Sequence, residues 1–228
     1  IDVELTATPR CGVQRYTFPD GDASVILNLA KAMNWDATVD SDIRMVDSVT
    51  VTGYRYSNGW ARDQKVYFAT RFSRPFASVD LDSVAIETDG KVTGSGKIAT
   101  FRYPEMKSGE RLVVVTALSP VSEDGAMANL NAEAPGDDFD GYRASAREQW
   151  NRELSKVGIS LPADLDEQTA LDRKTVFYTA LYHSMLAPTL FCDVDGAYPG
   201  PDGKIHHADG WVNYSSFSLW DTYRASHP

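Results

Sequence analysis

Hydrophobic and polar residues alternate along the first half of the chain, from residue 1 to about residue 132. The clearest case is residues 49–56, which are followed by turn-forming residues at 57–59 and by a second alternating stretch at 65–72. This combination predicts a β-hairpin. The same alternation of hydrophobic and polar residues continues at residues 79–86, 96–103 and 111–118. Several short strands at this spacing predict an antiparallel β-sandwich or barrel.

The hydrophobic period changes after the turn-forming residues 135–138. Over residues 142–157 the apolar positions recur at spacings of three and four, which predicts an amphipathic helix. Asp137 or Asp138 is suited to cap its N-terminus, and Gly158 is suited to follow its C-terminus.

Further helices are predicted beyond this one. Residues 166–186 carry apolar side chains on more than one stripe, which predicts a helix buried on two sides that ends before Pro188. Residues 191–208 are rich in Gly, Pro and Asp and predict a loop. A third helix is predicted over residues 213–226.

The chain therefore divides into three parts. We expect a β-sandwich domain over residues 1–135, a helical linker over 136–160 and the start of a helical domain over 161–228. The sequence opens in an alternating pattern at Ile1, as though in mid-strand, so the sandwich is expected to be incomplete at its N-terminus. Two or three helices make a poor core, so the helical domain is expected to be incomplete at its C-terminus.

Composition excludes some classes of protein. The 228 residues carry a formal net charge of −10, which argues against nucleic-acid binding because phosphates require clustered Lys and Arg. No apolar run approaches the roughly 18 residues of a membrane helix, and no signal peptide is recognisable at Ile1. The two cysteines, Cys11 and Cys192, permit one disulfide without predicting it, and we expect both to be unpaired.

Two groups of residues suggest a metal-binding site, but neither fits such a site well. Residues 193–204 begin like a calcium-binding EF-hand loop, but the ligand positions and the glycine do not match. A turn-rich hairpin in which Asp side chains cap their own backbone fits better. His206, His207 and Asp209 could be ligands, but adjacent side chains of an extended segment point to opposite faces. A structural role, or a place in the lining of a substrate site, fits one of the histidines better.

Aromatic residues recur every third position from residue 211 to residue 223. This spacing could be the core-facing stripe of a helix, an interpretation that suits Tyr214 and Phe217. Trp220 and Asp221 allow two interpretations. Asp221 could pair with Arg224 on the helix surface; alternatively, Trp220 could stack on a sugar ring while Asp221 accepts hydrogen bonds from its hydroxyls.

Trp60 follows the turn of the predicted hairpin and could face a cleft or pack at the base of the hairpin. The sequence contains no nucleophile elbow, no phosphate-binding loop and no paired Cys ligands, and nothing in it pairs a general acid with a general base.

Several motifs resemble glycoside hydrolase family 92, the calcium-dependent exo-acting α-mannosidases. Three lie near the end of the sequence: residues 191–196 (Phe-Cys-Asp-Val-Asp-Gly), 202–206 (Asp-Gly-Lys-Ile-His) and 217–224 (Phe-Ser-Leu-Trp-Asp-Thr-Tyr-Arg). Similar segments occur earlier, at residues 15–19, 59–68 and 177–183. The resemblance therefore extends over nearly the whole chain.

The resemblance implies an N-terminal β-sandwich, a helical connector and the first helices of a truncated (α/α)6 barrel. It also implies hydrolysis of terminal α-linked mannose with inversion, which uses a general acid and a general base. The acid, the base and the calcium ligands are expected downstream of Pro228, so no catalytic or metal-binding residue is assigned within this chain. The isolated chain is expected to be inactive without the remainder of the polypeptide or a second chain that carries it.

By the same resemblance, Trp220 and Asp221 are assigned to the wall of the mannose-binding subsite, with His206 and Arg224 as further substrate-binding residues. The expected substrate is a mannose-containing glycan of the N-glycan type, and the expected location is secreted, periplasmic or cell-surface. Two other classes stay open: a non-catalytic, lectin-like β-sandwich that binds carbohydrate, and a purely structural sandwich that braces the barrel. The sequence leaves the linkage specificity and the oligomeric state undetermined.

Overall fold

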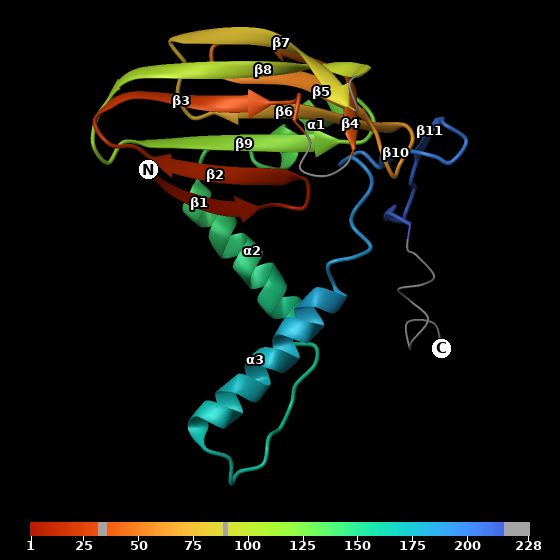
Figure 1. The fold of residues 1–228 in the computed structure, drawn as a ribbon. Helices are drawn as coiled ribbons and strands as arrows, with labels where there is room; N and C mark the ends of the chain where they lie inside the picture. Colours follow the sequence, from red (N-terminus) through yellow and green to blue (C-terminus); the bar gives the residue numbers. More distant parts are fainter. Residues whose placement is uncertain (32–35, 89–90, 217–228) are drawn as a thin grey trace.

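The computed structural model describes residues 1–31, 36–88 and 91–216. Figure 1 shows two β-layers stacked at one end of the molecule, with long helices extending away from them and a loop segment beside the sandwich. The predicted order of a β part followed by helices is confirmed.

The larger layer is a six-stranded antiparallel sheet in the order β1-β2-β9-β6-β5-β4. Its strands are β1 (Asp2–Ala7), β2 (Cys11–Thr17), β4 (Ala37–Met45), β5 (Thr50–Asn58), β6 (Gln64–Phe72) and β9 (Arg111–Ser119). The predicted hairpin is β5 and β6, in which Thr50 pairs with Arg71 and Ser57 pairs with Gln64.

The smaller layer is a three-stranded antiparallel sheet in the order β3-β8-β7. Its strands are β3 (Gly21–Asn28), β7 (Ser78–Thr88) and β8 (Lys91–Met106). The facing sides of the two sheets enclose the main core, in which the rings of Phe72 and Phe101 lie 4.7 Å apart. The inward side chains come from alternate strand positions, as the sequence pattern requires.

A short helix, α1 (Glu123–Glu133), covers the outer face of the larger sheet. Ala126 and Leu130 are fully buried there in a second hydrophobic cluster with Val13 and Val115 of the sheet. This stretch was predicted to be part of the β region, and that prediction was wrong. The segment contains Gly125 and two Asn residues, which are weak helix formers, so tertiary packing stabilises the helix more than propensity does.

The predicted linker helix is α2 (Phe139–Leu154), and Asp138 caps its first turn by accepting a hydrogen bond from the backbone N–H of Gly141. The predicted role of Gly158 was wrong, because the helix ends at Leu154 with Ser155 as its C-cap. A proline-containing loop then leads to α3 (Glu167–Ser184), whose N-cap is Asp166.

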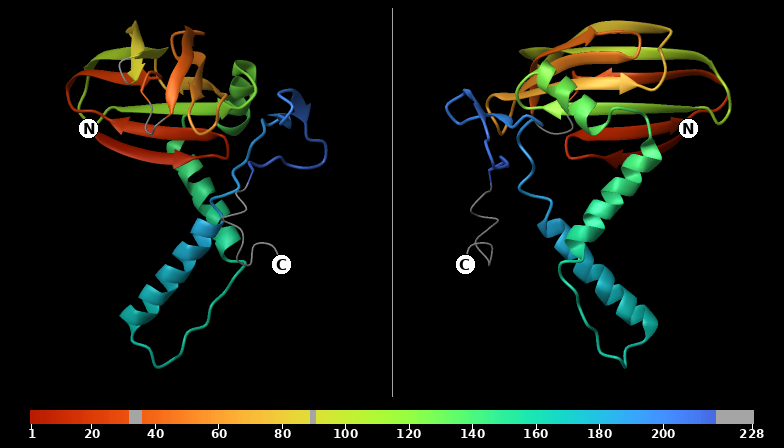
Figure 2. Two further views of the ribbon diagram at one scale, coloured as in Figure 1. Left: turned by 45° about the vertical axis from the view of Figure 1, so that its right-hand side comes forward. Right: turned by 180° about the vertical axis from the view of Figure 1, so that it is seen from behind.

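The expectation that α3 is buried on two sides is not met within the described residues. None of its residues is buried, and Leu171 and Val176 are exposed. The helix extends away from the sandwich (Figure 2), and its contact with α2 includes an edge-on stack of the Trp150 and Tyr182 rings. Part of the apolar surface of α3 is therefore exposed to solvent in the described part of the chain.

The predicted loop at residues 191–208 contains a small hairpin, formed by β10 (Ala197–Pro199) and β11 (Ile205–His207). The third helix is not formed at residues 213–216, where Tyr214 instead makes an isolated antiparallel bridge with Leu190. Tyr214 is also half-exposed, so its predicted place in a core was wrong. Residues 217–226 of that predicted helix, Phe217 included, lie outside the described residues. None of the described helices is long and apolar enough to cross a membrane.

Candidate functional site

The β10–β11 hairpin presents a cluster of rings and polar groups at its surface. The Tyr198 ring lies 5.8 Å from the His206 ring and 5.4 Å from the Trp211 ring, measured between centroids. His206 is exposed, and its Nε2 atom lies 2.9 Å from Oδ1 of Asp202. We call Tyr198, Asp202, His206 and Trp211 the hairpin cluster. Flat apolar faces beside hydrogen-bonding groups are typical of a site for a neutral sugar.

Turn chemistry explains why the hairpin forms here. Asp195 accepts a hydrogen bond from the backbone N–H of Ala197, and Asp202 accepts one from that of Lys204. The predicted turn-rich hairpin with Asp residues capping their own backbone is confirmed for these two residues. The His206 ring packs directly over Gly200, where a Cβ atom would lie 2.5 Å from the ring.

The electrostatics of the hairpin cluster favour binding over proton transfer. The hydrogen bonds from His206 and from the backbone of Lys204 hold the pKa of Asp202 below its ordinary value. Asp202 is therefore a carboxylate at neutral pH that accepts hydrogen bonds and is poorly suited to protonate a leaving group.

His207 follows His206 in strand β11. In the parts of the chain that the structure describes, no three His, Cys, Asp or Glu side chains gather to hold a metal ion.

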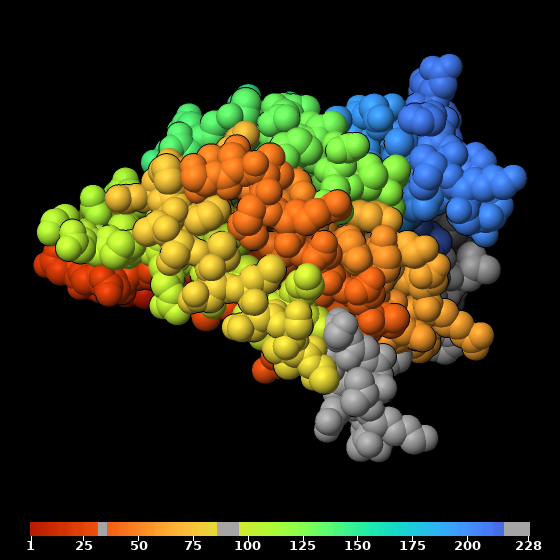
Figure 3. All heavy atoms as spheres, turned by 90° about the horizontal axis from the view of Figure 1, so that it is seen from above, coloured from red at the N-terminus to blue at the C-terminus, as the bar shows by residue number. Residues whose placement is uncertain are grey.

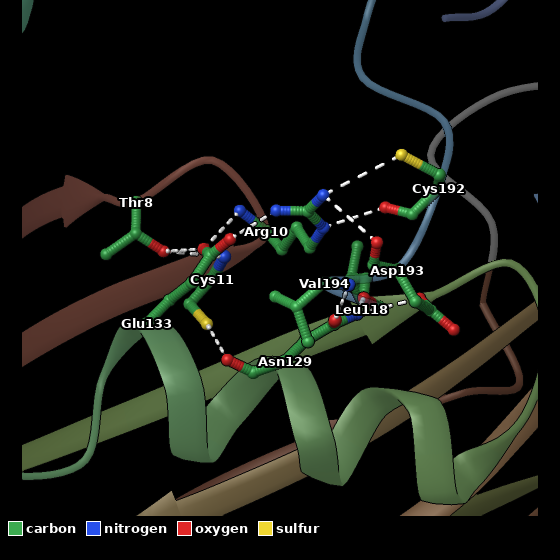
Figure 4. Close-up of polar contacts among 9 residues, drawn as sticks. All are labelled: Thr8, Arg10, Cys11, Leu118, Asn129, Glu133, Cys192, Asp193 and Val194. Atoms are coloured by element: carbon green, nitrogen blue, oxygen red, sulfur yellow. Dashed lines mark hydrogen bonds and ion pairs between the residues drawn. The ribbon is translucent and has the colours of Figure 1, made fainter. Parts of the chain in front are cut away.

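A buried carboxylate connects this hairpin to the sandwich (Figure 4). Asp193 is 2% exposed, and each of its side-chain oxygens accepts one hydrogen bond. Asn129 of α1 donates to Oδ1 at 2.8 Å, and the Ser119 hydroxyl at the end of β9 donates to Oδ2 at 2.7 Å. The carboxylate thus joins a residue of the loop to two elements of the sandwich domain. We call Ser119, Asn129 and Asp193 the anchor.

Arg10, in the turn between β1 and β2, holds the same loop from the other side. Its guanidinium donates to the backbone oxygens of Cys192 at 2.7 Å and of Asp193 at 3.2 Å. Glu133, at the end of α1, pairs with the guanidinium at 2.6 Å and also accepts hydrogen bonds from the Arg10 backbone and from Thr8. The ion pair therefore fixes Arg10 in the orientation that holds the loop.

Burial and hydrogen bonding have opposite effects on the pKa of the Asp193 carboxyl in the anchor. Desolvation raises the pKa of the Asp193 carboxyl above its ordinary value, and the hydrogen bonds from Ser119 and Asn129 act in the opposite direction. Because both oxygens accept from donors, the carboxylate is the form that satisfies the site. Cys11 and Cys192 are also buried near this region, and both are free thiols, as the sequence analysis expected.

The described structure contains one of the four predicted substrate-binding residues, His206. Trp220, Asp221 and Arg224 lie outside the described residues, so their assignment stays a prediction. Trp60 has 88% of its surface exposed, and both interpretations of this residue, facing a cleft or packing at the base of its hairpin, stay predictions. The anchor was missed, although Asp193 belongs to one of the motifs that carried the family resemblance. A buried Asp cannot be distinguished from a turn-capping Asp by local sequence, because its partners are 64 and 74 positions away.

Comparison with known proteins assigns the family. The N-terminal domain of glycosyl hydrolase family 92 matches residues 1–119, and the catalytic domain of the same family matches residues 125–228. The chain belongs to glycosyl hydrolase family 92. The resemblance inferred from the motifs is confirmed over both parts of the family 92 chain. A comparison with curated protein sequences found no match.

Solved structures of family 92 proteins agree with this assignment. The α-mannosidase BT3965 from Bacteroides thetaiotaomicron is 32% identical over 99% of this chain and 31% of its own, with a TM-score of 0.85. Its complex with mannoimidazole aligns with a TM-score of 0.84 at the same identity, over 99% of this chain and 30% of that one. The inverting mannosidase BT2199 from the same organism is 28% identical over 98% of this chain and 29% of its own, with a TM-score of 0.76. The family 92 chain thus spans less than a third of the length of these proteins.

Proposed function

We propose that the protein takes part in removing terminal α-linked mannose from glycans, with inversion at the anomeric carbon. The observation that carries the proposal is the similarity along 99% of the chain to a family 92 α-mannosidase, which has also been solved with mannoimidazole. Inversion is supported by the similarity to BT2199, an inverting mannosidase of family 92.

Within this proposal, the hairpin cluster and the segment that follows it form one wall of the sugar site. Tyr198 and Trp211 offer ring faces to the C–H face of a sugar, and His206 offers a hydrogen-bonding nitrogen to a hydroxyl. Trp220 and Asp221 extend the wall by stacking and by accepting hydroxyl hydrogen bonds, and Arg224 donates. Oriented hydrogen bonds of this kind distinguish one sugar from another because a wrong partner leaves them unpaired.

The acid, the base and calcium are assigned outside this sequence. The chain spans 31% of the length of the α-mannosidase that it resembles, and the carboxylates of Asp193 and Asp202 accept hydrogen bonds from the protein's own side chains. We assign the general acid and the general base, which inversion places about 6.5–9.5 Å apart, to the remainder of the family's catalytic domain. Calcium would be held there too and would supply a cation for the sugar hydroxyls.

The test is mannose release from an aryl α-mannoside by the complete natural polypeptide that carries this sequence. We expect release that is lost when calcium is chelated, and no release by the 228-residue chain alone. Asp221→Ala in the complete polypeptide should lower kcat/KM by a hundredfold or more, since several kcal/mol of hydroxyl recognition are lost.

Two results would count against the proposal. Calcium-dependent release by the isolated chain would show that the acid and the base lie within it. A wild-type rate for Asp221→Ala, with an unchanged melting temperature, would return Asp221 to a surface pair with Arg224.

A further inference from the structure

We infer that Asp193 is a positioning residue for the proposed sugar site, because its buried carboxylate fixes the substrate-binding hairpin against the β-sandwich. The inference rests on the proposed function and extends it to a residue that does not itself face the substrate. Figure 3 shows the hairpin segment, in blue, at one edge of the sandwich. The anchor is therefore a joint between the sandwich and a segment of the catalytic domain.

The anchor is built for a carboxylate. The Ser119 oxygen accepts hydrogen bonds from the backbone N–H groups of Val121 and Ser122, so its own hydrogen is directed to Asp193. The second hydrogen of the Asn129 amide goes to the backbone oxygen of Leu118. Ser119 and Asn129 therefore each present one hydrogen to Asp193. A carboxamide at position 193 would turn its NH2 group toward one of these donors.

The anchor also fixes the backbone that leads into the hairpin. The Asn129 side-chain oxygen accepts a hydrogen bond from the Val194 N–H at 2.8 Å. Asp193 donates its own N–H to the backbone oxygen of Ala197, and its carbonyl accepts from the N–H of Gly196. Ala197 is the first residue of β10, which carries Tyr198 and pairs with the strand of His206. A displacement at Asp193 therefore moves the hairpin cluster.

Gly125 shows how closely the carboxylate approaches α1. A Cβ atom at this position would lie 2.2 Å from Oδ2 of Asp193 and 2.8 Å from the Ser119 hydroxyl oxygen. Alanine is a much better helix former than glycine, so helix propensity alone predicts that Gly125→Ala stabilises α1. The anchor predicts the opposite, because the methyl group would displace Asp193.

The first experiment compares Asp193→Asn with Asp195→Asn in the complete natural polypeptide. Asp195 lies two residues further along the same loop, is exposed, and accepts one hydrogen bond that an amide oxygen can also accept. We expect Asp193→Asn to lower kcat/KM at least tenfold through a raised KM, and to speed amide hydrogen exchange across residues 196–207. Asp195→Asn should match the wild type in both measurements.

A purely structural role for Asp193 gives a different result. The melting temperature of Asp193→Asn would fall while KM, kcat and the exchange of residues 196–207 stayed at wild-type values, and the inference would be overturned. Gly125→Ala provides the second variant, in which Asp193 itself is unchanged. We expect it to reproduce the raised KM, and the double variant Gly125→Ala/Asp193→Asn should be no worse than either single one. A stabilised Gly125→Ala protein with wild-type KM would also contradict the inference.

Failure of the proposed function can be distinguished from failure of the positioning role of Asp193. If the wild-type polypeptide released no mannose, the activity proposal would fail, while hydrogen exchange would still report the hairpin. Faster exchange across residues 196–207 in Asp193→Asn, but not in Asp195→Asn, would support the positioning role. Equal exchange in the two variants would overturn it.

Discussion

At the residue scale, three aspartates of one loop have different roles. Asp195 and Asp202 cap turns in their own neighbourhood, whereas Asp193 is buried between two elements of the sandwich domain. The first two roles could be predicted, because a turn-capping Asp acts on backbone only two residues away. The third could not, since it depends on donors that folding brings from distant positions.

The two leucines Leu130 and Leu171 give a matched test of packing. Leu130 is fully buried between α1 and the larger sheet, whereas Leu171 on α3 is 57% exposed. We predict that Leu130→Ala lowers the free energy of unfolding of this chain by about 2–5 kcal/mol, because it removes buried surface and leaves a cavity. Leu171→Ala should change it by less than about 0.5 kcal/mol.

Urea denaturation of the 228-residue chain measures both changes. Equal losses for the two variants would contradict the placement of α1 on the sheet, because an α1 that did not pack there would leave Leu130 as exposed as Leu171.

At the element scale, the sequence predicted strands and long helices better than short or isolated ones. The β5–β6 hairpin alternates, α2 has an apolar stripe and α3 is a long segment with apolar residues on more than one stripe, and each formed close to its predicted place. Helix α1 carries a weak pattern, and its three buried residues, Ala126, Asn129 and Leu130, include a polar one. Asn129 is buried because both the oxygen and the nitrogen of its side-chain amide make hydrogen bonds at the anchor. A periodicity argument counts that position as polar and therefore misses the helix.

Helix α2 is docked on the sandwich through Arg15 of β2. The guanidinium pairs with Glu4 of β1 at 2.6 Å and with Asp140 of α2 at 2.7 Å, and it lies 4.3 Å from the centre of the Phe139 ring. The hydrogen bonds from Arg15 hold the pKa values of both carboxyls below their ordinary range. One side chain thus connects two strands and a helix.

These ion pairs make the free energy of unfolding depend on pH, in a direction that follows from the two pKa values. Because the folded pKa values of Glu4 and Asp140 are depressed, their contribution to stability is fully present above the ordinary carboxyl pKa of about 4 and is lost as the pH falls through the folded values. We predict that Asp140→Asn gives a shallower fall in the free energy of unfolding between about pH 5 and pH 3. Glu148→Gln, at an exposed position of the same helix, should follow the wild-type curve. Parallel curves for wild type and Asp140→Asn would contradict the assignment.

At the scale of the whole molecule, the sandwich is closely packed and the helices beyond it are not. Helix α3 extends away from the sandwich (Figures 1 and 2), and its apolar residues Leu171 and Val176 are exposed. Helix α1 lies within the part of the chain that matches the family's catalytic domain, yet it packs on the sandwich. The two family domains are therefore interlocked here, and the predicted boundary at residue 135 stays a prediction.

Sequence reasoning reached the family and the architecture because both depend on motifs and periodicity that are local in the chain. It reached only part of the site. His206 was proposed from its motif, but the anchor and the hydrogen bonds from Arg10 to the loop depend on contacts between residues more than 60 positions apart. The assignment of His206 to a sugar site stays a prediction, whereas the contacts that position its hairpin could be found only in the structure.

We propose that this chain forms one wall of the sugar site of an inverting α-mannosidase. The decisive measurement is proton NMR of the first mannose released from an α-mannoside by the complete natural polypeptide. An inverting reaction produces β-mannose first, and the α-anomer then appears by mutarotation. We expect β-mannose as the first product; α-mannose as the first product, or no release of mannose, would overturn the proposal.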